Sequence, residues 1–268
     1  MTIASDRLPA WLRLGIRDLI ERNRVIRGIH LRQIAPELDL IEAEVSAMRG
    51  PWHEFLTGRP TTGMTERVVE IPWILSRYAG EARVLEVGPT FAYTTYIDHL
   101  NRLGIEELHG LDLSTRPVRG IRLIQGDVRD MPYPDGQFDL VHCVSTIEHV
   151  GLDVTKYGVD APRARDDGDV AALREMRRVL APGGRIRITV PFGRPETLDW
   201  MRQYDLAAWQ RVVDASGLRS EETEIYGYSE TDGWTRRVPP ALPSAGYREL
   251  GAPAGTGLLC ACLTPTSA

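Results

Sequence analysis

Acidic residues stand near the ends of two successive β-rich segments of the chain. Asp112 lies in the segment Glu107–Ser114, and Asp127 ends the segment Ile121–Asp127. Ligands of a doubly wound sheet bind beyond the carboxyl ends of its strands, so both carboxylates would face one ligand. Asp112 could accept the two hydroxyls of a ribose, and Asp127 could accept an exocyclic amine, with Val128 as an apolar wall for the ring. The alternative is that both aspartates are ordinary strand-end caps.

A glutamate and a glycine lie at the end of the preceding β-rich segment, Ala82–Gly88. Gly88 would let the backbone approach a ligand closely. Glu86 would be costly to bury in an apolar strand unless it is paired, which favours a role at the same site. The turn from Gly88 to Tyr93 holds one glycine, whereas a dinucleotide site needs the pattern G-x-G-x-x-G for its pyrophosphate. We therefore predict a nucleoside ligand without phosphates, such as adenosine carrying an amino acid, over the dinucleotide of a nicotinamide-dependent oxidoreductase.

Three polar residues lie at or just beyond the end of the fourth β-rich segment, Phe138–Thr146. They are Ser145, Glu148 and His149, and all three would reach the same rim of the sheet. A neutral histidine can remove a proton from a hydroxyl near physiological pH, so His149 is the candidate catalytic base, with Glu148 beside it. The alternatives are that His149 only packs over the ligand and that Ser145 satisfies backbone groups at a strand end.

Short β-rich runs that alternate with helical or loop segments would position these residues. Residues 64–80 predict a helix stopped by a glycine, and residues 169–184 predict another that ends at Pro-Gly-Gly. Strands that alternate with helices form a parallel sheet through right-handed crossovers, so the fold predicted is α/β with a doubly wound, mostly parallel sheet of seven strands. The runs predicted as strands are Ala82–Gly88, Glu107–Ser114, Ile121–Asp127, Phe138–Thr146, Arg185–Phe192, Glu221–Ser229 and Gly257–Pro265.

The first 63 residues differ in pattern from the rest and predict a helical extension or lid. Apolar residues recur at helical spacing within residues 6–48, and arginines occupy the opposite face. This basic amphipathic helix could cover a partner, including a second copy of the chain in a homodimer, or lie on a membrane. The simpler expectation is a solvated face on a helix that packs against its own domain.

The overall composition argues against several classes of partner. Acidic residues outnumber basic ones 37 to 32, for a net charge of −5, so no electrostatic reason favours nucleic acid. No run approaches the ~20 apolar residues that a membrane helix needs, and the N-terminus does not resemble a signal peptide. We therefore expect a cytoplasmic protein without a membrane partner. The three cysteines lie in apolar runs, which predicts reduced, buried thiols and no metal site.

Two long, turn-rich insertions interrupt the alternation, at residues 150–168 and 230–255. Such loops are often lids or binding loops. The acidic residues of the first could bind Mg²⁺ together with Glu148, but their spacing matches no fixed ligand template, so a solvated acidic loop is expected. In the second insertion, Trp234, Arg236, Arg237 and Tyr247 could form an acceptor pocket or a plain surface loop.

Four motifs together resemble those of the class I S-adenosylmethionine-dependent methyltransferases. They are "RVLEVG", "GLDLS", "IQGDVRDMPYPDGQFDLVHCVSTIEHV" and "LREMRRVLAPGGRIRITVP", which follow the order and spacing of that family between Arg83 and Phe192. The resemblance implies a Rossmann-like methyltransferase domain over residues 64–268 with S-adenosylmethionine as cofactor. In style the motifs are most similar to those of small-molecule methyltransferases that act on sugars or secondary metabolites. This implies methyl transfer to an oxygen, less favourably a nitrogen, of a small polar acceptor.

The family pattern also implies roles for individual residues. Glu86 and Gly88 would lie at the methionine end of the cofactor, and Asp112 would hold the ribose hydroxyls. Leu113 would lie against the adenine, and Asp127 would face the adenine amine with Val128 next to Asp127. Ser145 would lie near the sulfonium. The sequence departs from the family in the turn after Gly88, which usually carries two or three glycines. A methyltransferase-like domain that serves assembly without catalysis is the non-enzymatic alternative.

Overall fold

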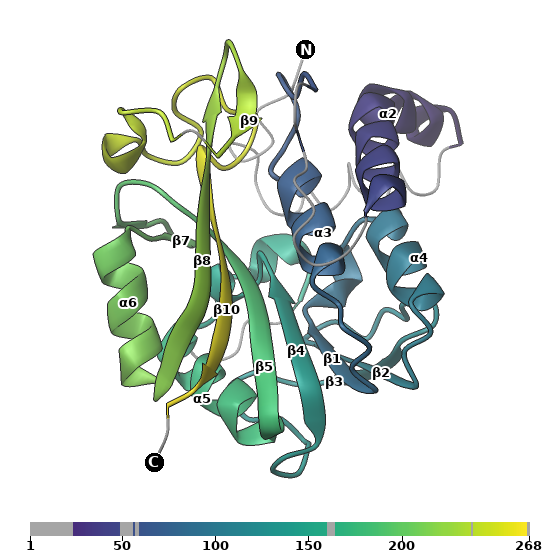
Figure 1. Ribbon diagram of the computed structural model, residues 1–268, viewed down its shortest axis with the longest axis vertical. Helices are drawn as coiled ribbons and strands as arrows, with labels where there is room; N and C mark the ends of the chain where they lie inside the picture. The colour runs from purple at the N-terminus through teal and green to yellow at the C-terminus, as the bar shows by residue number, and fades with distance from the viewer. Residues whose placement is uncertain (1–23, 49–55, 57–58, 160–163, 237, 267–268) are drawn as a thin grey trace.

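The computed structural model describes residues 24–48, 56, 59–159, 164–236 and 238–266, and its centre is an eight-stranded sheet (Figure 1). The strand order is β3-β2-β1-β4-β5-β10-β8-β9. The first five strands pair in parallel, and β10 lies antiparallel between β5 and β8. The bounds are β1 Arg83–Val87, β2 Glu107–Asp112, β3 Arg122–Gln125, β4 Phe138–Val144, β5 Leu180–Pro191, β8 Leu218–Ser229, β9 Gly233–Thr235 and β10 Gly257–Pro265.

All seven runs predicted as strands are strands of this sheet, so the predicted α/β fold with a mostly parallel sheet is confirmed. The predicted strand count is short by one, because β9 adds a three-residue edge strand. Two further strands, β6 Glu196–Thr197 and β7 Arg202–Gln203, pair only with each other. β5 begins earlier than predicted because Leu180 pairs with Phe138 before a shift of register.

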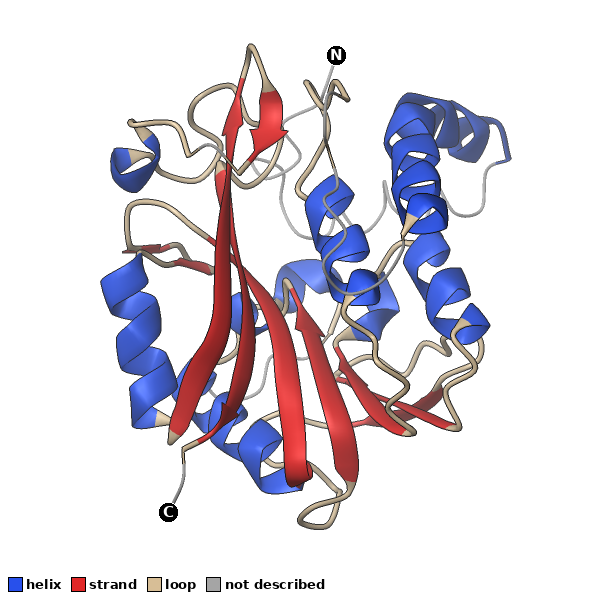
Figure 2. Cartoon of the chain, viewed as in Figure 1, coloured by secondary structure: helices blue, strands red, loops and turns tan. Residues whose placement is uncertain are grey.

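Helices cover both faces of the sheet, as Figures 1 and 2 show. On one face lie α2 (Arg24–Ala47), α3 (Arg67–Ser76) and α4 (Thr94–Arg102). On the other lie α5 (Gly168–Val179) and α6 (Leu206–Ala215). The predicted helices at 64–80 and 169–184 are therefore present as α3 and α5. Each is shorter than its prediction, and α5 ends directly before the first residue of β5.

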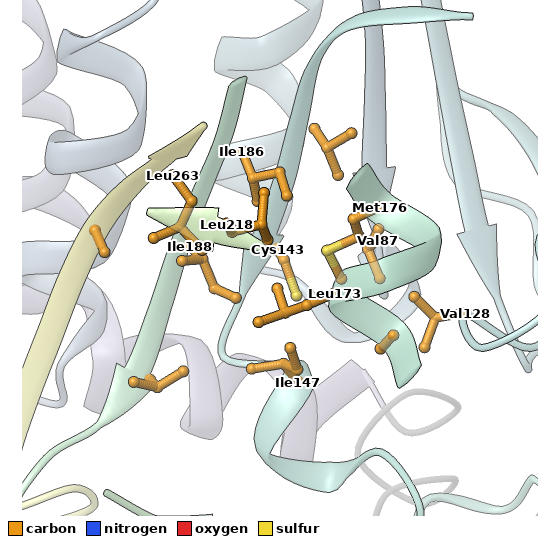
Figure 3. Close-up of a cluster of buried hydrophobic side chains, with 14 of the residues drawn as sticks. Val87, Val128, Cys143, Ile147, Leu173, Met176, Ile186, Ile188, Leu218 and Leu263 are labelled. Atoms are coloured by element: carbon orange, nitrogen blue, oxygen red, sulfur yellow. The ribbon is translucent and has the colours of Figure 1, made fainter. Parts of the chain in front are cut away.

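Apolar residues from both layers pack against the sheet and fix the strand ends. Figure 3 shows Leu173 and Met176 of α5 among Val87 of β1, Cys143 of β4 and Ile186 of β5. All five side chains are buried. Burial of a large apolar side chain stabilises the fold by ~1.5–3 kcal/mol, so this layer stabilises the packing of α5 against β1, β4 and β5. The three cysteines are buried free thiols, as predicted.

The described part of the N-terminal extension packs against its own domain. Residues 24–47 form α2, in agreement with the predicted helix, and residues 6–23 of that prediction lie outside the described part. Ile41 is fully buried in the same apolar cluster as Trp73 of α3. Glu37 accepts hydrogen bonds from Thr65 at 2.5 Å and from the Tyr93 hydroxyl at 3.0 Å. This part of α2 is thus tied to the segments that lead into α3 and α4.

Within the described residues, no helix combines the length and the apolar character that crossing a membrane would require.

Candidate active site

A cavity opens at the carboxyl ends of β1, β2, β3 and β4, the edge that the sequence predicts for a ligand. Its wall contains every residue predicted to bind the cofactor, namely Glu86, Gly88, Asp112, Leu113, Asp127, Val128 and Ser145. His149 also lines it, together with residues 150–152, 154, 157 and 159 of the first insertion. Residues at or just beyond the ends of four strands therefore meet at one space, which we call the cofactor cavity.

The turn after β1 needs its single glycine for a steric reason. Gly88 has a φ of 75°, in the left-handed region, and its N–H donates to the Leu111 carbonyl at 2.9 Å. A Cβ at this position would lie 2.5 Å from Oγ1 of Thr146. The chain then continues as a short 3₁₀ turn, Pro89–Phe91, in place of a glycine-rich loop. The turn therefore keeps the close approach at Gly88 and loses the further glycines that a pyrophosphate would require.

Asp112 caps the end of β2 and lines the cofactor cavity. One carboxylate oxygen accepts the N–H of Thr90 at 3.0 Å, and the other accepts the N–H of Ser114 at 2.9 Å. These bonds cap the strand end and fix the carboxylate against the cofactor cavity. Each carboxylate oxygen has a second lone pair, so the group can still accept one hydroxyl on each oxygen.

Asp127 is held by a neighbour that the sequence reasoning missed. The guanidinium of Arg129 donates to it at 2.6, 3.0 and 3.1 Å, and the Arg129 N–H adds a bond at 2.9 Å. Partial burial works to raise the pKa of Asp127, but the hydrogen bonds from Arg129 outweigh it and hold the pKa below its ordinary value. Asp127 is therefore an ionised acceptor in the wall, and Arg129 lies in the wall beside it.

Glu86 is paired, which meets the condition that its burial imposes. It is 1% exposed, and its carboxylate accepts the Tyr96 hydroxyl at 2.9 Å. Nδ1 of His142, on the neighbouring strand β4, lies 3.2 Å from the same carboxylate oxygen. Burial, together with the charge of Glu86, raises the pKa of Tyr96 well above its ordinary value, so the phenol remains a donor. This cluster of three side chains places one fixed carboxylate at the end of β1.

Ser145 joins the cofactor cavity to a buried ion pair. Its φ of 41° is left-handed, and its N–H donates to Oγ1 of Thr189 at 3.0 Å. Its hydroxyl donates to Glu70, which also accepts Oγ1 of Thr189 at 2.8 Å and pairs with Arg67. Glu70 is fully buried, and Ser145 and Arg67 line the cofactor cavity and a second cavity beside it. The sequence did offer one signal for Glu70, an acid within the otherwise apolar face of α3.

His149 stands in the wall that the two cavities share. Its Nδ1 lies 2.7 Å from the Trp200 carbonyl, and its ring stacks on the Trp200 ring with the centroids 5.4 Å apart. A carbonyl only accepts, so Nδ1 carries the proton and Nε2 is the acceptor nitrogen in the neutral ring. Nε2 lies 3.4 Å from the Tyr157 hydroxyl. The fold therefore fixes His149 in the tautomer that a base requires.

Glu148 faces the second cavity and is 2% exposed. Its Oε1 lies 3.8 Å from Nε2 of His149, and its Oε2 has no hydrogen-bond partner among the described residues. Burial raises the pKa of Glu148 well above its ordinary value, because the charged form is poorly solvated there. The two candidate catalytic residues thus lie side by side, with Glu148 disposed to stay protonated.

In its described part, the second insertion contributes one of the four residues that could have formed an acceptor pocket. Tyr247 lines the second cavity, but Trp234 and Arg236 do not. Trp234 is buried in the core and donates its indole N–H to the Met64 carbonyl at 3.0 Å, while Arg236 lies over the Tyr226 ring. Arg237 lies outside the described residues. Trp200, which follows β6, takes the place of these residues as an aromatic wall and was not anticipated from the sequence.

The acidic part of the first insertion makes local contacts. Asp153 accepts the N–H and hydroxyl of Thr155, and Asp167 pairs with Arg165 at 2.8 Å. Asp160 lies outside the described residues. In the part of the chain that the structure describes, no group of three or more His, Cys, Asp and Glu residues could hold a metal ion.

Comparison with known proteins identifies the family. A family model described as "Methyltransferase domain" matches residues 85–188, the segment that builds most of the cofactor cavity. The ubiquinone/menaquinone biosynthesis C-methyltransferase UbiE of Pseudomonas putida (strain GB-1) is 29% identical over 228 residues, 83% of this chain and 80% of the relative. The chain is a class I S-adenosylmethionine-dependent methyltransferase. Its cofactor is therefore S-adenosylmethionine.

Two further similarities of this methyltransferase are more limited. UbiE of Pseudoalteromonas translucida is 29% identical over 127 residues, 47% of this chain and 42% of the relative. The crystal structure titled "[4+2]-Cyclase SpnF" superposes with a TM-score of 0.50 and covers 90% of this chain and 96% of its own. At 17% identity that likeness bears on the fold alone.

The residues of the cofactor cavity fit S-adenosylmethionine chemically. Leu113 and Val128 supply apolar wall for a purine, and Asp112 retains acceptor capacity for a ribose diol. The cofactor carries no phosphate, so the one-glycine turn after β1 is compatible with it. When bound, it supplies a methyl group on a sulfonium, and the chain must position the acceptor and accept any proton released.

Proposed function

We propose that this methyltransferase transfers the methyl group to a hydroxyl oxygen of a small polar molecule, such as a sugar or a secondary metabolite, that binds in the second cavity. The observation that carries the proposal is the place of His149, in the wall between the cofactor cavity and the second cavity. Its tautomer leaves Nε2 to accept the proton of an acceptor hydroxyl.

The lining of the second cavity supports a polar acceptor. Glu66, Arg67 and Glu148 contribute charged or ionisable groups to it, and Ser145 contributes a hydroxyl. A long hydrocarbon chain in this cavity would cover these polar groups without replacing their hydrogen bonds to water. Hydroxyl or amino groups of a polar acceptor can hydrogen-bond to them instead. Within this proposal Asp112 holds the ribose, Leu113 and Val128 contact the adenine, Asp127 faces its amine, and Glu86 and Gly88 flank the methionine end.

Methylation of a carbon atom is the second candidate. The relatives at 29% identity are named ubiquinone/menaquinone biosynthesis C-methyltransferases. A base that ionises an aromatic hydroxyl also makes the adjacent ring carbon nucleophilic, so His149 would serve that reaction as well. The two candidates differ in the atom that gains the methyl group.

The test is to incubate the protein with isotope-labelled S-adenosylmethionine and extracts of its host, and to identify the labelled product by mass spectrometry. Fragmentation or NMR then locates the methyl group on oxygen or carbon. Calorimetric titration with S-adenosylmethionine and S-adenosylhomocysteine provides the control on the first step. If neither binds at millimolar concentration, the proposed function is wrong whatever the extract contains.

A further inference from the structure

The second cavity combines two kinds of group that together attract cations. Glu66 and Glu148 present carboxyl groups, and Trp200, Tyr247 and Tyr157 present aromatic rings. The negative face of an aromatic ring attracts a cation within about 6 Å of its centre, and a carboxylate adds a direct ion pair.

The arginine that lines the second cavity already has a carboxylate partner. The guanidinium of Arg67 pairs with Glu70, whose other carboxylate oxygen is bound by Ser145 and Thr189. Glu66 accepts the N–H of Gly255 at 3.2 Å, and burial raises the pKa of Glu66 as it raises that of Glu148. Arg67 is thus held by Glu70 rather than by Glu148.

Glu148 is the group that this arrangement leaves unsatisfied. It is 98% buried, and its Oε2 has no hydrogen-bond partner in the described part of the chain. A buried acceptor without a partner costs about 1–3 kcal/mol, so a ligand that brings a donor within reach of this carboxyl group would be favoured. Burial keeps the pKa of Glu148 high in the absence of such a ligand, and a neighbouring cation would lower it.

The aromatic wall already receives a cation at one of its rings. The guanidinium carbon of Arg248 lies 5.5 Å from the centroid of Tyr247. Tyr247 in turn meets Trp200 edge to face at 5.6 Å, and Trp200 stacks on His149. The three rings from Tyr247 to His149 therefore form one continuous aromatic wall that leads to the proposed base.

We propose that the acceptor of this enzyme carries an ammonium group, which the carboxyl group of Glu148 binds against the aromatic wall formed by Trp200 and Tyr247. This inference rests on the proposed function, in which the second cavity holds the acceptor. The substrate class is then a small hydroxylated amine, whose ammonium group is bound at Glu148 and whose hydroxyl faces His149.

The experiment is calorimetric titration of the protein, saturated with S-adenosylhomocysteine, with ethanolamine and with its uncharged isostere propan-1-ol. The two probes have nearly the same shape and differ in the charge and the N–H donors of the ammonium group. We expect ethanolamine to bind at least tenfold more tightly, and Glu148→Gln to weaken ethanolamine at least tenfold while leaving the isostere unchanged. Glu221→Gln, on the exposed part of β8, is the matched control and should change neither.

Equal binding of the two probes, or no ethanolamine binding to a protein that binds S-adenosylhomocysteine, would overturn the ammonium inference and leave the methyltransferase intact. Failure to bind S-adenosylhomocysteine would instead refute the proposed function. Circular dichroism checks that Glu148→Gln is folded. If it is not, Tyr247→Leu carries the test, with a several-fold loss of ethanolamine affinity expected and an unchanged affinity for the isostere; an unchanged ethanolamine affinity refutes the inference.

Discussion

Replacement of His149 by glutamine separates its two possible roles, base and cavity wall. A side chain that removes a proton in the transition state contributes ~10²–10⁴-fold to the rate, or about 2.7–5.4 kcal/mol of activation free energy. Glutamine is close in size to histidine and can still donate to the Trp200 carbonyl, which lies 2.7 Å from Nδ1. It has no basic nitrogen. We therefore expect kcat to fall at least 100-fold while the Kd for S-adenosylhomocysteine changes less than threefold.

The assay is transfer of label from S-adenosylmethionine to the acceptor identified from host extract, with cofactor affinity measured by calorimetry. Tyr157→Phe is a control, because it removes a hydroxyl that lies 3.4 Å from Nε2 and keeps the ring that packs edge-on against His149. A contact of that length is weak, so kcat should change by no more than about threefold. Equal losses of kcat and of cofactor affinity in His149→Gln would refute the assignment and make His149 a wall residue.

Three other substitutions test the cofactor cavity and its surroundings. Gly88→Ala forces a Cβ into Thr146 at a left-handed position; it should lower the free energy of unfolding by ~1–3 kcal/mol in denaturant titration, and unchanged stability would contradict the steric account. Asp112→Ala removes the ribose acceptor and should weaken S-adenosylhomocysteine at least tenfold by calorimetry, so retained affinity would show that Asp112 is a strand cap only. Glu148→Gln should gain stability over the wild type as pH rises. The pKa of Glu148 is raised in the folded state, so the stability that its protonated form contributes is complete below the unfolded pKa of ~4.3 and is lost as pH rises through the folded pKa. Denaturant titration at pH 5 and pH 8 measures the difference, and an equal difference at the two pH values would argue against a raised pKa.

The sequence predicts the main strands well because each is a short apolar run bounded by turn residues. The same reasoning does not find β6, β7 and β9, since two or three residues are too few to show an alternating pattern. β10 was found as a strand, but its antiparallel place between β5 and β8 follows from tertiary pairing and has no local signal.

The walls of the cofactor cavity could be predicted because topology alone brings strand ends together. The hydrogen-bond partners of those residues could not be predicted, because the partners come from distant segments of the chain. Ser145 meets Glu70 across 75 positions of the chain, and His149 meets the Trp200 carbonyl across 51. Arg129 is the exception, since it lies two residues after Asp127, where a side chain can fold back on the turn. The roles of these residues stay predictions until the variants are measured.

The position of β10 also bears on how the chain is completed during synthesis. The cofactor cavity is lined by residues 67–159, whereas Gly257 and Leu258, at the start of β10, belong to the wall of the second cavity. On the ribosome, the segment that lines the cofactor cavity therefore emerges well before the last strand that the second cavity needs. Until β10 enters the sheet, β5 keeps an open edge that can pair with other chains. A chain released before residue 257 would thus lack both part of the wall of the second cavity and the strand that protects the sheet from aggregation.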